Sequence, residues 1–81
     1  MATITIQEIK EDMRINNDSD VFYYDSENNI GYHMHECSNG KCVFMMNTGK
    51  KISYISEEDF LEAVENKCYR ASIGHDSYYT I

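Results

Sequence analysis

Three short turns divide the middle of the chain into β-prone segments, and their spacing constrains the fold more than any other feature. The turns lie at residues 26–29, 38–40 and 47–49, and they consist largely of Ser, Asn and Gly, which favour reverse turns. The segments between and around them are residues 21–24, 30–37, 42–46 and 51–55. Strands joined by such short turns must be antiparallel neighbours. The pattern therefore predicts a four-stranded meander.

Two amphipathic helices are expected on either side of the meander. Thr5 followed by Glu8 matches a capping box, and Ser56 followed by Asp59 has a similar spacing. The first helix should end in the polar run at residues 16–20. The second carries an apolar stripe of Phe60, Leu61, Val64 and Cys68, spaced to pack on a sheet.

The expected architecture is a single α+β domain of 81 residues, in which two helices pack on one face of a four- to five-stranded antiparallel sheet. The alternating residues Tyr69, Ala71 and Ile73 supply a fifth strand, and residues 78–81 read as a further one. We expect a cytoplasmic protein, because the N-terminus does not resemble a signal peptide and three Cys cannot form a complete disulfide set.

A formal net charge of −7 narrows the class of partner. Such a surface repels nucleic acid and anionic membranes, and it attracts basic proteins. No catalytic motif or glycine-rich phosphate loop is present, so we expect no enzymatic activity. The sequence instead favours a binding protein whose partner is basic, with a homodimer left open.

The second helix concentrates this charge. Glu58, Glu62 and Glu65 share one side of it, at spacings that place carboxylates roughly 5–6 Å apart. Phosphates along a nucleic-acid strand have a similar separation, so this row could occupy a basic channel meant for DNA or RNA. The remaining members of the expected partner surface are two acids near a turn, Asp25 and Glu27, and two tyrosines, Tyr23 and Tyr54. Tyrosine is a common anchor at protein interfaces.

Cysteine and histidine around the second turn supply an alternative of another class. Zinc prefers four thiolate or imidazole ligands, and His35, Cys37, Cys42 and Cys68 could provide them. His33 and His35 should share one strand face with Cys37. Against this zinc site stands a structural explanation, in which Cys37 and Cys42 face each other across a hairpin, reduced or as a disulfide, and Cys68 belongs to the core.

In size, acidity and lack of a catalytic motif, the chain resembles small phage-encoded inhibitors of host defence, of the anti-CRISPR kind. The resemblance implies a stoichiometric inhibitor that binds a host nuclease or its nucleic-acid channel. Members of that group have unrelated folds, so no residue role is carried over.

The leading hypothesis is an acidic inhibitor that occupies a basic nucleic-acid-binding surface and needs no cofactor. Besides the zinc domain, a second alternative is an oligomeric nucleotide sponge. Its tyrosines would stack on bases, while Lys50, Lys51 and Arg70 would form a local basic pocket.

Overall fold

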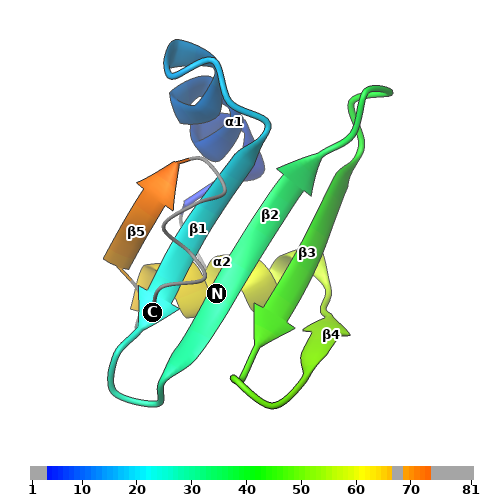
Figure 1. Cartoon of the computed structure of the whole chain (residues 1–81). Coiled ribbons are helices and arrows are strands. Elements are labelled where there is room, and N and C mark those ends of the chain that lie inside the picture. Colours follow the sequence, from blue (N-terminus) through cyan, green and yellow to red (C-terminus); the bar gives the residue numbers. More distant parts are fainter. Residues whose placement is uncertain (1–3, 67–68, 74–81) are drawn as a thin grey trace.

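The turns produce the predicted meander, and one more strand completes the sheet (Figure 1). The computed structural model describes residues 4–66 with their side chains and residues 69–73 by their backbone alone. The elements are α1 (Ile6–Ile15), β1 (Asp20–Asp25), β2 (Ile30–Glu36), β3 (Cys42–Asn47), β4 (Ile52–Tyr54), α2 (Glu57–Asn66) and β5 (Tyr69–Ile73). The strand order is β4-β3-β2-β1-β5, and every pairing is antiparallel. The α+β prediction is confirmed.

Both predicted helix starts are capped as expected. The backbone N–H of Glu8 donates to Thr5 Oγ1 at 3.2 Å, and the N–H of Thr5 donates to Glu8 Oε1 at 3.0 Å. At α2, the N–H of Asp59 donates to Ser56 Oγ at 3.1 Å. These bonds satisfy N–H groups that a helix leaves without partners in its first turn, so local sequence fixes where each helix begins.

Both helices contribute to one core on the same face of the sheet, and Figure 1 shows α2 running behind the strands. The core consists of Ile9 and Met13 from α1, Phe60 and Val64 from α2, and Val21, Tyr23, Met34 and Phe44 from the strands. The rings of Phe44 and Phe60 lie 5.0 Å apart. Cys68 and the predicted strand at 78–81 lie outside the described residues.

Tyr23 belongs to this core and not to the surface. It is 7% exposed, and its ring contacts Phe60 edge-on with centroids 6.0 Å apart. The expectation that Tyr23 anchors a partner is therefore wrong. Alternation explains its position, because Val21 and Tyr23 point to the same face of β1 and that face is covered by the helices.

The β2–β3 hairpin has a different register from the one that the sequence suggested. An Asn-Gly two-residue turn would pair Cys37 with Cys42, but the N–H of Cys37 bonds to the carbonyl of Lys41 and Glu36 pairs with Cys42. The loop thus has three residues, and Gly40 takes the left-handed conformation (φ 87°) that such loops require. Cys37 and Cys42 are free and do not face each other.

A contact from α1 holds the tip of this hairpin. Lys10 Nζ donates to the carbonyl oxygen of Gly40 at 3.1 Å and lies 3.5 Å from Glu36 Oε2.

Across residues 4–66 and 69–73, no helix is long and apolar enough to cross a membrane.

Candidate functional site

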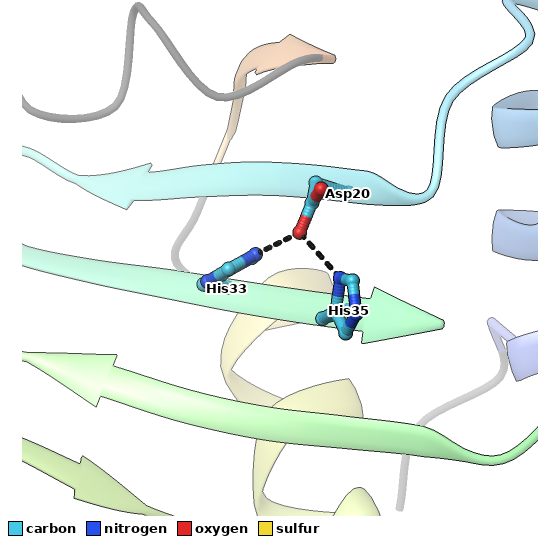
Figure 2. Close-up of side chains that lie close together, drawn as sticks. All are labelled: Asp20, His33 and His35. Atoms are coloured by element: carbon cyan, nitrogen blue, oxygen red, sulfur yellow. Dashed lines mark hydrogen bonds and ion pairs between the residues drawn. The ribbon is translucent and has the colours of Figure 1, made fainter. Parts of the chain in front are cut away.

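Asp20, His33 and His35 converge on the sheet face opposite the two helices, which we call the histidine face. Asp20 is the first residue of β1, and the two histidines lie on β2. The β1–β2 register pairs Asp20 with His35 and Phe22 with His33. Residues paired across strands, and residues two apart along a strand, point to the same face. The hairpin therefore brings all three side chains together (Figure 2).

One carboxylate oxygen contacts both imidazoles. Asp20 Oδ1 lies 2.7 Å from His33 Nε2 and 2.8 Å from His35 Nδ1. His35 stands directly across from Asp20 and uses its near nitrogen, whereas His33 stands diagonally and reaches with its far nitrogen. Different ring atoms thus compensate for different distances along the strand.

Burial and hydrogen bonding set the charges of the carboxylate and the buried imidazole. Burial opposes ionisation of Asp20, but hydrogen bonds from His33 and His35 outweigh it, so the pKa of Asp20 lies below its usual value. Burial also lowers the pKa of His33, and the nearby Asp20 only partly offsets this effect. At neutral pH the site therefore holds a carboxylate anion and a neutral His33. An ionised carboxylate and a neutral imidazole are the forms that act as metal ligands.

The immediate surroundings fix these side chains. The ring of His33 stacks on Phe22, with centroids 4.3 Å apart and planes at 27°, and Phe22 is fully buried. Ser19 Oγ donates to the second carboxylate oxygen of Asp20 at 3.4 Å. The side chain of His33 is 14% exposed, that of Asp20 is 17% exposed and that of His35 is 41% exposed. The site is thus rigid at His33 and accessible at His35.

The arrangement fits a divalent transition-metal ion. The three candidate ligand atoms all lie within 4.8 Å of one another. Metal–ligand bonds of about 2.0–2.1 Å place neighbouring ligand atoms roughly 3.0–3.4 Å apart. The two N–O contacts need to open by only a few tenths of an ångström to admit an ion. Two imidazoles and one carboxylate form a donor set that suits zinc, iron, nickel or copper.

The structure does not assemble the four zinc ligands expected from sequence. His35 pairs with Val43, while Cys42 pairs with Glu36, one position away along the strands. Cys42 therefore points to the opposite face from His35, where it packs against the core. Burial raises the pKa of its thiol, which disfavours the thiolate that binds metal. Cys37 lies beyond the end of β2, and Cys68 is outside the described residues.

The predicted acidic surface is formed in part. Glu58, Glu62 and Glu65 are all exposed on α2, Glu27 is exposed in the first turn, and Tyr54 on β4 is 79% exposed.

Asp25 is only 2% exposed, so its assignment to a partner surface is wrong. Its carboxylate accepts bonds from the backbone of the turn that follows. The donors are the N–H groups of Glu27 and Asn28, at 3.1 and 3.2 Å. A carboxylate that accepts the backbone N–H groups of its own turn in this way stabilises that turn.

The three basic residues proposed to bind nucleotides do not meet. Lys50 and Lys51 precede β4 at one edge of the sheet, and Arg70 lies on β5 at the other edge. Four strand spacings of about 4.8 Å separate the two edges. A shared basic pocket is therefore excluded for one copy of the chain.

Sequence reasoning found His33 and His35 on one face but missed their partner. Asp20 was assigned to the polar run that ends the first helix, and it instead begins β1. The pairing of residues across the first hairpin could have identified Asp20 from the sequence. If Asp25 and Ile30 flank the four-residue turn, counting back five residues on one strand and forward five on the other pairs Asp20 with His35.

Comparison with known proteins identifies no relative: no family model matches the chain, and neither the curated proteins nor the solved structures contain a significant match.

Proposed function

We propose that the protein binds a divalent transition-metal ion through Asp20, His33 and His35. The observation that carries the proposal is the contact of one carboxylate oxygen with two imidazole nitrogens, at 2.7 and 2.8 Å. Three potential ligand atoms from adjacent strands already lie within 4.8 Å of one another. The ion would replace the two hydrogen bonds that join the side chains of β1 and β2 on this face, and the proton on each contacting ring nitrogen would move to the other nitrogen of that ring or to solvent.

Calorimetric titration with zinc tests the proposal. The expected result is one zinc ion per chain, and Asp20→Asn should weaken binding by about tenfold or more because it removes the anionic ligand. Asp18→Asn is the matched control, because it makes the same change two residues earlier and outside the cluster. Equal affinities for the two variants would refute the assignment, since zinc would then be held by other acids.

Thermal unfolding gives an independent measure. A ligand that binds only the folded state at 100 times its dissociation constant stabilises that state by about 2.7 kcal/mol. In a domain of this size, each kcal/mol raises the melting temperature by roughly 4–8 °C. Zinc should therefore raise the melting temperature of the Asp18→Asn variant by more than 10 °C. If Asp20→Asn binds tenfold more weakly, its stabilisation falls to about 1.4 kcal/mol, so its melting temperature should rise by only about half as much.

We also propose that α2 contacts a basic surface of a partner protein, in line with the inhibitor hypothesis. The supporting observation is that Glu57, Glu58, Asp59, Glu62 and Glu65 are all exposed and the last turn of α2 has no basic residue. Solvated acids of this density attract basic surfaces, and the attraction weakens with added salt.

Displacement of labelled DNA from purified basic DNA-binding proteins tests this second function. The test variant carries Glu58→Gln, Glu62→Gln and Glu65→Gln. The control carries Glu11→Gln, Asp18→Asn and Glu27→Gln, so both lose three negative charges. If the protein acts through α2, only the test variant loses displacement. Equal loss would show that bulk charge is responsible, and no displacement by the unmodified protein would dismiss the function.

A further inference from the structure

The histidine face offers three metal ligands and no fourth within the described chain. Position along the strands identifies the other residues of β1 to β4 on this face. They are Phe22 and Tyr24 on β1, Gly31 on β2, Val43, Met45 and Asn47 on β3, and Ile52 and Tyr54 on β4. None of them is a His, Cys, Asp or Glu. Zinc takes four ligands, and structural sites draw all four from protein whereas catalytic sites leave one position open.

Charge balance points to what would fill the remaining position. Two neutral imidazoles and one carboxylate leave a bound divalent ion with a net charge of about +1, which makes it the largest local positive charge. The residues closest in register, Phe22, Val43 and Met45, are apolar and supply no compensating anion. The acids of α2 project from a helix on the other side of the sheet.

Access is available at one ligand. The side chain of His35 is 41% exposed, compared with 14% for His33, which is stacked on Phe22. A small molecule would therefore approach from the His35 side.

Building on the proposed metal site, we infer that its bound ion accepts a small exogenous anion, such as a carboxylate, at an exchangeable coordination position. The protein would then act as a metal-dependent anion-binding module. The anion would approach from the exposed edge of His35.

Cobalt substitution tests this inference with azide as the probe. Cobalt(II) commonly occupies zinc sites, and its visible absorption reports the ligand set. One equivalent of cobalt should give a visible spectrum, and azide should change that spectrum saturably, with a single dissociation constant. The Asp18→Asn variant should behave in the same way, and Asp20→Asn should give no site-bound spectrum.

The two proposals fail in different ways. If cobalt gives no stoichiometric spectrum, the metal site itself is wrong. If cobalt binds with one equivalent but azide leaves the spectrum unchanged, the metal site stands and the anion inference is overturned. Coordination is then completed by the chain, and the residues to replace next are Cys68, His75 and Asp76, which lie outside the described part.

Discussion

Replacing Asp25 tests whether a buried carboxylate holds the first turn. Its Oδ1 accepts two backbone N–H groups, and its Oδ2 accepts the side-chain amide of Asn28 at 2.9 Å. Asp25→Ala removes all three bonds at a position that is 2% exposed. At about 1 kcal/mol for each hydrogen bond, the loss is about 3 kcal/mol. This is a large part of the roughly 5–15 kcal/mol that stabilises a small domain.

Asp25→Asn distinguishes the contribution of Oδ1 from that of Oδ2. The amide keeps an acceptor for the N–H groups of Glu27 and Asn28 and loses only the partner of the Asn28 side chain. We expect a loss of about 1 kcal/mol. Glu27→Ala is the control, because an exposed side chain in the same turn should change stability by no more than about 0.5 kcal/mol.

Urea unfolding measures the series. The free energy of unfolding of a small domain falls by about 1 kcal/mol per M urea. Asp25→Ala should therefore lower the urea concentration at the midpoint of unfolding by about 3 M, and Asp25→Asn should lower it by about 1 M. A stabilising role for the Asp25 carboxylate is refuted if Asp25→Ala unfolds at the same urea concentration as Glu27→Ala. If the Asn and Ala variants are equally unstable, the bonds to Oδ1 contribute nothing.

Two further predictions concern titratable groups. Burial raises the pKa of the Cys42 thiol, so iodoacetamide should label Cys42 at pH 8 more slowly than it labels glutathione. The tryptic peptide 42–50 contains Cys42 as its single cysteine, so mass spectrometry of this peptide measures the labelling rate. Equal rates for Cys42 and glutathione would contradict the effect of burial. The pKa of Asp20 is lower in the folded chain than in the unfolded chain, so its stabilisation is present above pH of about 4 and is lost as the pH falls further. Metal-free Asp20→Asn should therefore lose less stability between pH 5 and pH 3 than Asp18→Asn does, as measured by urea unfolding, and identical losses would argue against the ion cluster.

Local signals predicted the elements of this fold well. The capping residues Thr5 and Ser56 mark both helix starts, because a cap is satisfied within four residues and needs no tertiary information. The turns likewise give the order of β1 to β4. Placing β5 beside β1 depends on long-range packing, which no local pattern encodes.

The candidate site was harder to predict because it depends on register. One residue more or less in a turn moves every side chain of the following strand to the other face. The second turn shows this effect, since the three-residue loop directs Cys42 to the core and away from His35. Asp25 and Tyr23 were misassigned for a related reason: composition suggested surface, whereas alternation places both on the same face of β1 as the buried Val21.

The position of β5 has a consequence for synthesis of the chain. β1 carries Asp20, yet its second neighbour in the sheet is formed by residues 69–73. While the polypeptide emerges from the ribosome, the edge of β1 away from β2 lacks its strand partner until almost the entire described chain has been translated. Pairing over some fifty residues is slow compared with hairpin closure. The β1–β2 hairpin can therefore bring Asp20 to the histidines early, and the strand that carries Asp20 is secured on both sides only by the last described segment.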